Sequence, residues 1–298
     1  MSSLVLGTSG LGSGDRDAAI ETATALLRSG LLIDTSNSYA GGASERVLGL
    51  ALSALPPAER ADAAARLITK VDADPASGAF DADRVRRSAE ESLIRLGVDR
   101  FPLLHLHDPY SVTIDEALAP GGAVEGLLRL RDDGVAGAIG IAAGPIPLMR
   151  RYVAGGAFDA VLSHNRFTLV DRSATALFED ARRRGMTVFN AAPFGGDLLA
   201  RGPRPGATYG YRPIDEALAS WTTALFDLCT RHGVAPASVA LRFSTGSSLV
   251  DHTVVGISSQ ARLAQLRDLD ETRIPAELWA AVDALGPAPA PVEDGARA

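Results

Sequence analysis

Residues 67–70 read Leu-Ile-Thr-Lys, a short apolar run that ends on an ammonium group. Lys70 is the only lysine among 29 basic residues. Two similar runs flank it: residues 31–33 end at Asp34, 36 positions before Lys70, and residues 103–106 end at His107, 37 positions after it. A spacing of this size holds one strand, one helix and their loops, so the three runs predict successive βα units.

Short apolar runs of this kind recur along the whole chain, and amphipathic segments separate them. Eight runs are typical of strands: residues 4–6, 31–33, 67–70, 103–106, 136–139, 159–162, 186–189 and 253–255. Six segments carry apolar side chains at helical spacing: residues 18–29, 83–96, 124–130, 148–153, 174–183 and 214–229. Alternating strands and helices predict a parallel sheet, and eight such units favour a single closed (β/α)8 TIM barrel over an open doubly wound sheet.

The organisation of the chain suits one domain. Its 298 residues, 46% of them hydrophobic, are ample for the core of one barrel. We assign residues 1–285 to the barrel and residues 286–298 to a Pro/Ala-rich tail, disordered or draped over the surface, with little to bury. The longest irregular stretch, residues 197–213, follows the seventh strand and fits a lid and a plain surface loop equally well.

Composition argues against several kinds of partner. The net charge of −7 disfavours nucleic acid and anionic membranes, which bind clustered Lys and Arg. No run approaches the ~18 apolar residues of a membrane span, and residues 1–12 lack the basic start of a signal peptide. Cys229, the only cysteine, lies in an apolar helical stretch and is expected to be a buried, inert thiol. We expect a cytoplasmic protein, a monomer or homo-oligomer, that acts on small molecules.

Polar side chains with complementary chemistry follow three successive strands. Asp34, Lys70 and His107 end strands two, three and four, and Tyr39 lies five residues beyond Asp34. The carboxyl ends of barrel strands form the active-site face, so these side chains can converge. A phenol can protonate the alkoxide left by hydride addition to a carbonyl, although its reference pKa of ~10 makes it a sluggish acid. A nearby ammonium lowers that pKa, a carboxylate holds the ammonium, and an imidazole can donate to the substrate oxygen.

Each of these residues has a plainer explanation when it is taken alone. An aspartate after a strand often caps the next helix, a loop tyrosine usually packs, and a histidine at a strand end is usually structural. His105 competes with His107, because alternation places both on one face of the strand. An arginine-biased genome explains the arginines but not the single lysine, whose ammonium can be tuned by burial. The joint hypothesis is a catalytic centre formed by Asp34, Tyr39, Lys70 and His107.

Here the sequence resembles the aldo-keto reductase family. Residues 34–39 (Asp-Thr-Ser-Asn-Ser-Tyr), 42–45 (Gly-Ala-Ser-Glu) and 48–49 (Leu-Gly) are similar to its signature, and residues 106–109 (Leu-His-Asp-Pro) to its Leu-His-x-Pro segment. This likeness selects His107 over His105 and implies that the family's catalytic tetrad is Asp34, Tyr39, Lys70 and His107. Residues 107–109 and 165–171 resemble the sugar and pyridoxal dehydrogenase branch, such as L-fucose or D-threo-aldose 1-dehydrogenases.

The resemblance also implies a cofactor, NADP or NAD, laid across the barrel mouth. No Gly-x-Gly-x-x-Gly follows the first strand, so a Rossmann site is not supported. By resemblance, residues 7–9 lie near the nicotinamide, residues 192–199 form the pyrophosphate loop, and residues 256–262 hold the adenosine end, where a helix start suits a phosphate. The implied cofactor contacts are Gly7, Thr8, Ser9, Asp34, His164, Asn165, Asn190, Pro193, Phe194, Gly196, Leu198, Gly256, Ser258, Ser259 and Arg262.

The sequence departs from the family pattern in three places. Ala142 and Ala143 replace the usual Ser-Asn pair that holds the carboxamide, so that contact is expected from Asn165. Ser258 stands where Arg or Lys often meets a 2′-phosphate, which gives a slight preference for NAD, although Arg262 can compensate. The amino-terminal hairpin that closes the barrel bottom in the family is reduced or absent.

The expected substrate is a small carbonyl or alcohol compound: a sugar, an aldehyde or a pyridoxal-like ring. Candidate pocket residues are Asn37, Tyr110 and Phe194, with Asp108 and the loop around Tyr209 and Tyr211 beside them. No metal is called for. One alternative is a cofactor-binding regulatory subunit resembling those attached to potassium channels. Another is a barrel aldolase in which Lys70 forms a Schiff base.

Overall fold

Eight parallel strands close into a barrel in the computed structural model, which describes residues 3–289 and residue 294. The strands are β1 (Ser3–Gly7), β2 (Leu32–Asp34), β3 (Leu67–Val71), β4 (Leu104–His107), β5 (Ile139–Ala143), β6 (Ala160–His164), β7 (Thr187–Ala191) and β10 (His252–Gly256). Around the barrel their order is β1-β10-β7-β6-β5-β4-β3-β2. The predicted TIM barrel is confirmed, and the carboxyl ends of all eight strands meet at one mouth.

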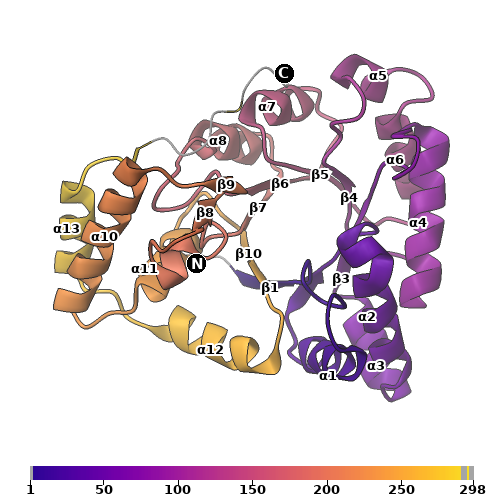
Figure 1. Ribbon diagram of the computed structural model, residues 1–298. Helices are drawn as coiled ribbons and strands as arrows, with labels where there is room; N and C mark the ends of the chain where they lie inside the picture. Colours follow the sequence, from indigo (N-terminus) through magenta and orange to yellow (C-terminus); the bar gives the residue numbers. More distant parts are fainter. Residues whose placement is uncertain (1–2, 290–293, 295–298) are drawn as a thin grey trace.

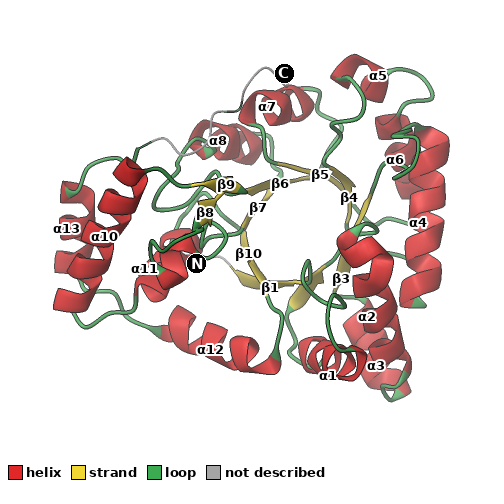
Figure 2. Cartoon of the chain, viewed as in Figure 1, coloured by secondary structure: helices red, strands yellow, loops and turns green. Residues whose placement is uncertain are grey.

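Helices surround the barrel on all sides (Figures 1 and 2). They are α1 (Arg16–Leu27), α2 (Ala43–Ser53), α3 (Pro57–Ala64), α4 (Ala82–Leu96), α5 (Ile114–Leu118), α6 (Ala123–Asp132), α7 (Ile146–Ala154), α8 (Thr175–Arg183), α9 (Leu198–Arg201), α10 (Glu216–Arg231), α11 (Pro236–Thr245), α12 (Gln260–Glu271) and α13 (Ala276–Ala284), with a short 3-10 helix at Tyr39–Gly42. The six helical segments predicted from periodicity correspond to α1, α4, α6, α7, α8 and α10.

The fifth strand lies later in the chain than the sequence indicated. Residues 136–139 were expected to form it, but β5 begins at Ile139 and runs to Ala143. Ala136 makes only an isolated bridge to Phe101. Pro102 follows Phe101 and has no backbone N–H to donate to a neighbouring strand. Pairing between these two segments therefore resumes only at Leu104 and Ile139.

Two apolar layers hold the barrel, because alternate strand residues face opposite sides. Side chains such as Leu6, Ile33 and Leu104 belong to the large buried cluster that includes the surrounding helices. A separate cluster from several strands fills the interior with Val5, Ile68, Leu103, Ala142, Ala160, Leu162, Phe189 and Val254. At the amino end of β10 the His252 ring stacks on Phe189 with centroids 4.5 Å apart. Side chains therefore close this end of the described barrel.

The segment between β7 and α10 contains a small hairpin. β8 (Thr208–Tyr209) pairs antiparallel with β9 (Arg212–Pro213). The two turn residues, Gly210 and Tyr211, both have left-handed backbones, with φ of 54° and 68°. Tyr209 is buried, and its hydroxyl contacts Thr168 Oγ1 at 2.7 Å and the Asn165 carbonyl at 3.1 Å. The hairpin is thus anchored on the loop that follows β6.

The carboxyl-terminal tail touches the barrel where the structure describes it. Ala288 packs against the cluster that contains α10 and α13. The Asp294 carboxylate pairs with the buried Arg166 guanidinium and accepts from the backbone N–H of Ile146 at 2.8 Å. Cys229 is buried as expected, and burial raises the pKa of its thiol to about 11. Among the residues described, none of the helices combines the length and the apolar character that crossing a bilayer requires.

Candidate active site

The four residues proposed from sequence converge at the mouth of the barrel. The Lys70 ammonium donates to Asp34 Oδ2 at 2.7 Å, to the Thr35 carbonyl at 2.7 Å and to the Tyr39 hydroxyl at 3.1 Å. The Tyr39 and His107 rings meet edge to face, with centroids 5.7 Å apart. A phenol, an ammonium, a carboxylate and an imidazole therefore share one small space. In this arrangement the Lys70 ammonium directly contacts the phenol of Tyr39 and the carboxylate of Asp34.

Lys70 is one of the most buried side chains in the protein, with 1% of its side chain exposed. Its three N–H groups are all used by the contacts above. Burial by itself would lower the pKa of this ammonium, but the Asp34 carboxylate and the Tyr39 hydroxyl raise it well above its usual value. Lys70 is therefore a fixed positive charge in the barrel interior. The only lysine of the chain is thus a buried residue with specific contacts, and not a surface residue.

Tyr39 keeps its proton over the whole neutral range. Burial raises the pKa of its hydroxyl to about 12, and the opposing influence of Lys70 is smaller than the effect of burial. The expectation that Lys70 lowers this pKa describes Lys70's own contribution correctly, but the net shift has the opposite sign. The resting side chain is a phenol beside an ammonium. It is an acid whose conjugate base Lys70 stabilises.

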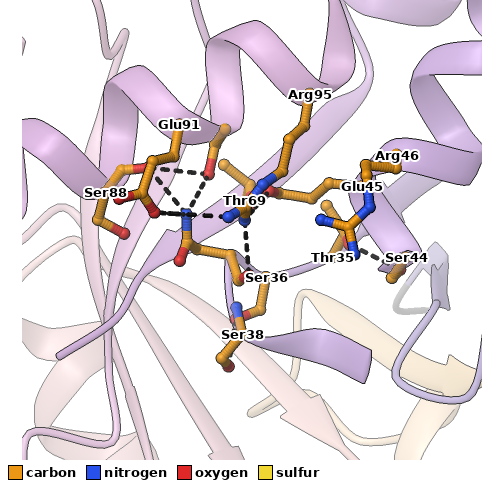
Figure 3. A network of polar contacts seen from close by, with 12 residues as sticks. Thr35, Ser36, Ser38, Ser44, Glu45, Arg46, Thr69, Ser88, Glu91 and Arg95 are labelled. Carbon is orange, nitrogen blue, oxygen red and sulfur yellow. Dashed lines mark hydrogen bonds and ion pairs between the residues drawn. The ribbon is translucent and has the colours of Figure 1, made fainter. Parts of the chain in front are cut away.

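A buried carboxylate, Glu45, holds the loop that carries Tyr39 (Figure 3). Glu45 is fully buried and accepts from Thr69 Oγ1 at 2.7 Å and from Arg95 Nη1 at 3.2 Å. Arg95 also donates to the Asn37 carbonyl at 2.9 Å. Burial raises the pKa of Glu45 despite these donors. The network ties the loop to β3 and α4, and so fixes the turn that presents Tyr39.

The Asn37 side chain belongs to this hydrogen-bond network and does not line the open mouth of the barrel. Its amide donates to the Ser88 carbonyl at 3.0 Å and to Glu91 at 3.1 Å, and it accepts from Arg84 at 3.3 Å. Its side chain is thus turned toward α4. The interpretation of Asn37 as a pocket residue is therefore corrected, because the amide's hydrogen-bonding groups are engaged in holding the loop.

His107 has a partner that sequence reasoning missed. Its Nδ1 lies 2.7 Å from Asp72 Oδ1, while Asp72 Oδ2 accepts from Ser36 Oγ at 2.6 Å and from the Ser38 N–H at 3.1 Å. Burial would raise the pKa of Asp72, but His107 and the two serines lower it below its ordinary value. Asp72 follows Lys70 by two residues, so alternation along the strand was the available signal.

This partner determines what His107 can do. A carboxylate accepts only, so Nδ1 of His107 carries a proton. The Nε2 atom then accepts from an alcohol when the ring is neutral, and donates to a substrate oxygen only when the ring is doubly protonated. His105, the alternative candidate for the catalytic histidine, is fully buried inside the barrel against Phe189. Burial lowers the pKa of His105 well below its usual value, so that ring is neutral.

The rim of the mouth is formed by the ends of β4, β5 and β6. Tyr110 is partly exposed, and its hydroxyl accepts from the Gly144 N–H at 3.1 Å. His164 Nδ1 contacts Asn165 Nδ2 at 3.1 Å. Asn165 is buried, has a left-handed backbone (φ 58°), and its Oδ1 has no hydrogen-bond partner within the described part of the chain. An unsatisfied buried acceptor beside the tetrad suits a ligand amide.

The first and last strands supply backbone and small residues to the same mouth. Gly7 ends β1, and a Cβ there would lie 3.2 Å from Val254. Thr8 is buried and contacts the Asp34 carbonyl at 3.1 Å, whereas Ser9 and Gly256 are exposed. After β10, Ser258 is exposed and Ser259 caps α12 through the Arg262 N–H at 3.3 Å. This helix start offers free backbone donors to an anion.

The residues after β7 divide between the mouth and the framework. Phe194 is half-buried, and Gly196 is exposed with a left-handed backbone. Leu198 is fully buried in the cluster beneath them, and Pro193 is also buried. The Asn190 amide donates to the Phe167 carbonyl and to Ser244 Oγ, both at 2.8 Å. Asn190 is therefore directed toward α11 and ties β7 to the helical layer.

A family model described as the Aldo/keto reductase family matches residues 3–287. The chain belongs to the aldo/keto reductase family, whose members are NAD(P)-dependent oxidoreductases. The resemblance drawn from residues 34–39 and 106–109 is thereby confirmed.

Characterised relatives are sugar and pyridoxal dehydrogenases. The chain is 33% identical over 203 residues to a D-threo-aldose 1-dehydrogenase of Pseudomonas sp, which covers 67% of this chain and 61% of that protein. It is 28% identical over 277 residues to an L-galactose dehydrogenase of Arabidopsis thaliana, covering 90% and 84%. A pyridoxal 4-dehydrogenase of Microbacterium luteolum is 28% identical over 209 residues, covering 67% and 61%. Two of these matches thus span less than two thirds of the relative's length.

Solved structures share the fold. The holo form of aldo-keto reductase AKR11C1 from Bacillus halodurans superposes with a TM-score of 0.78 at 23% identity, covering 99% of this chain and 95% of that one. The glycerol dehydrogenase AKR11B4 from Gluconobacter oxydans gives a TM-score of 0.72 at 21% identity, covering 95% and 90%. At this level of identity the likeness supports the barrel architecture alone.

Proposed function

We propose that this protein is an NAD(P)-dependent dehydrogenase or reductase in which Tyr39 transfers the proton, assisted by Lys70, Asp34 and His107. The observation that carries the proposal is the contact of 3.1 Å between the Lys70 ammonium and the Tyr39 hydroxyl inside a buried site. Membership of the family and the named relatives support it. The same chemistry runs in both directions, and the ratio of oxidised to reduced cofactor sets the direction.

Tyr39 acts as the acid in reduction and as the base in oxidation. Reduction of a carbonyl leaves an alkoxide, which takes the Tyr39 proton and leaves a phenolate. The Lys70 ammonium stabilises that phenolate, and Asp34 keeps Lys70 in place on its other side. In oxidation the phenolate removes the proton of the substrate hydroxyl. Asp34 contacts Lys70 rather than Tyr39, so it is a positioning residue for this step.

His107 orients the reacting oxygen. Because Asp72 holds the Nδ1 proton, the Nε2 atom faces the substrate as an acceptor in the neutral ring and as a donor in the imidazolium form. The neutral form suits an alcohol substrate, whose hydroxyl can donate to Nε2. The charged form suits a carbonyl substrate. Asp72 fixes the ring in either form and is proposed here as a positioning residue.

The mouth of the barrel fits a nicotinamide dinucleotide. When bound, that cofactor supplies or accepts the hydride. Asn165 would hold the carboxamide through its unpartnered Oδ1, while the loops at Gly7 and Gly196 and the start of α12 would hold the rest of the molecule. Ala142 and Ala143 are buried, and their side chains have no hydrogen-bonding group. Asn165 is therefore the proposed ligand of the carboxamide.

The proposed preference is for NAD, and the proposed substrates are sugars or related small carbonyl compounds. Ser258 is exposed at the start of α12 and offers no positive charge for a 2′-phosphate. Arg262, one turn further along the helix, is the one nearby cation on this helix start that could favour NADP. The named activities of the relatives, on an aldose, on L-galactose and on pyridoxal, support a small polar substrate.

A cofactor titration followed by a substrate panel tests the proposal. We expect NADH and NADPH fluorescence to change on binding, with tighter binding of NADH, and turnover with aldoses or pyridoxal in at least one direction. A Ser258→Arg variant should shift the preference toward NADPH. Failure to bind either dinucleotide, or binding without turnover of any carbonyl or alcohol in the panel, would refute the proposed activity.

A further inference from the structure

The carboxylate of Asp108 occupies an unusual position beside the catalytic histidine. Asp108 directly follows His107 and has a left-handed backbone (φ 41°), which residues other than glycine seldom adopt. Its Oδ2 lies 3.8 Å from His107 Nε2, and its Oδ1 lies 3.9 Å from His164 Nε2. Both distances are too long for a hydrogen bond. Strained residues of this kind cluster at ligand sites, where the surrounding structure holds them in place.

The Oδ1 atom of Asp108 is an unsatisfied acceptor. It is buried, and among residues 3–289 and 294 it has no hydrogen-bond partner. Burial would raise the pKa of Asp108, but the neighbouring His164 and His107 rings and Tyr110 lower it below its ordinary value. The group is therefore a carboxylate. A buried carboxylate oxygen without a donor costs free energy unless a ligand or a water molecule supplies the hydrogen bond.

His164 presents a donor toward this oxygen. Its Nδ1 lies 3.1 Å from Asn165 Nδ2, and an amide NH2 group can only donate. In the neutral ring the proton is therefore on Nε2, the atom that faces Asp108. Gly144 leaves room for the ring in this orientation, because a Cβ at position 144 would lie 3.1 Å from His164 Cε1. The exposed Tyr211 ring meets the His164 ring edge to face, with the two ring centroids 6.1 Å apart.

Together the two groups match a single hydroxyl. A polar gap of 3.9 Å is too long for direct contact and short enough for one oxygen to bridge. A hydroxyl in that gap donates to Asp108 Oδ1 and accepts from His164 Nε2–H. Resting on the activity proposed above, we propose that Asp108 and His164 form a subsite that binds a hydroxyl of the substrate next to its reacting carbon.

The position of the subsite defines the substrate class. Asp108 adjoins His107 in the chain and contacts its Nε2 side, and the His107 ring in turn lies against Tyr39. The bound hydroxyl therefore lies one or two carbons from the carbon that reacts. Hydroxyaldehydes and their cyclic forms have such a group, whereas simple aldehydes lack it. The hydroxyl next to the reacting carbon is then the feature by which the proposed enzyme selects its substrate.

The test compares two four-carbon aldehydes, D-erythrose and butanal, by steady-state reduction with NADH. The quantity measured is the ratio of kcat/KM for erythrose to kcat/KM for butanal. We expect wild-type protein to favour erythrose and Asp108→Asn to lower the ratio by about 10- to 100-fold, because the charged acceptor of the hydrogen bond is replaced by a neutral amide. Asp115→Asn, an exposed carboxylate paired with Arg151, is the matched control and should keep the wild-type ratio.

A second variant guards against misfolding of Asp108→Asn at its strained backbone. His164→Leu leaves Asp108 unchanged, removes the Nε2 donor and should lower the same ratio, while His164→Gln, which keeps an N–H donor, should restore part of it. A ratio that stays within about threefold of wild type in Asp108→Asn or His164→Leu, whatever the absolute rates, would overturn the subsite. Wild-type protein that turns over no carbonyl or alcohol in either direction would instead refute the proposed activity.

Discussion

The Lys70 ammonium lies 2.7 Å from the Asp34 carboxylate and 3.1 Å from the Tyr39 hydroxyl, with 1% of the lysine side chain exposed. The ion pair is buried, so each charge depends on the other for its stability. Lys70→Met would leave Asp34 as an unpaired buried carboxylate. We expect a loss of about 3–5 kcal/mol in the free energy of unfolding, measured by urea denaturation.

A double-mutant cycle isolates the pair. In Asp34→Asn/Lys70→Met neither charge remains, so the loss should be smaller than the sum of the two single losses by about 1 kcal/mol or more. Strictly additive losses would show that the two side chains do not interact. Activity should be low in all three variants.

The rate of oxidation should depend steeply on pH. The pKa of Tyr39 is about 12, so the phenolate required as base is scarce at neutral pH. We expect kcat/KM for alcohol oxidation to rise by up to about tenfold per pH unit from about pH 7 to about pH 10, since the base form increases in that proportion. Carbonyl reduction uses the phenol, which is fully populated there, and should show no such rise. A rate of oxidation that does not rise over this range, or a rate of reduction that rises instead, would contradict the assignment of Tyr39.

Asp72 should influence catalysis through His107 without touching the substrate. Asp72→Asn removes the carboxylate that accepts from His107 Nδ1–H and fixes the ring. We expect kcat for carbonyl reduction to fall by about 10- to 100-fold with KM changed little, because the ring no longer holds the reacting oxygen in place during proton transfer. Asp74→Asn, an exposed carboxylate two residues away, is the control. A rise in KM with kcat unchanged would contradict this positioning role.

The pair between Arg166 and Asp294 should stabilise the barrel. The side chains are 8% and 13% exposed, and Asp294 also accepts from the start of α7. Asp294→Ala leaves a buried guanidinium without its carboxylate, so we expect a loss of about 3 kcal/mol in urea unfolding. Asp283→Ala, which removes an exposed partner of Arg172, should leave the midpoint unchanged. Equal midpoints for both variants would contradict this role for the tail.

The barrel could be predicted because its signals are local. Apolar runs alternate with helical segments along the chain, and three successive runs end on Asp34, Lys70 and His107 at the same edge of the sheet. Helices such as α2 and α11 were not assigned, although α2 begins within the quoted signature at residues 42–45. The fifth strand was placed too early, because the sequence around Gly137 is apolar but faces Pro102.

The details of the site depend on side-chain contacts that spacing does not determine. Asn37 lies in the signature loop, yet its amide is directed to α4. Asp72 was overlooked because its role depends on where the His107 ring turns. The pKa of Tyr39 depends on the balance of burial against Lys70, and only the structure gives the extent of burial. Contacts of this kind are set by packing between elements distant in the chain.

If the Tyr39 hydroxyl transfers the proton, Tyr39→Phe should lose turnover and keep cofactor binding. The change removes one oxygen and keeps the ring that lies against His107. We expect the variant to bind NADH as wild type does by fluorescence titration, and to lose about 10²- to 10⁴-fold in kcat for aldehyde reduction. Unchanged cofactor binding with undiminished kcat would show that the Tyr39 hydroxyl does not transfer the proton.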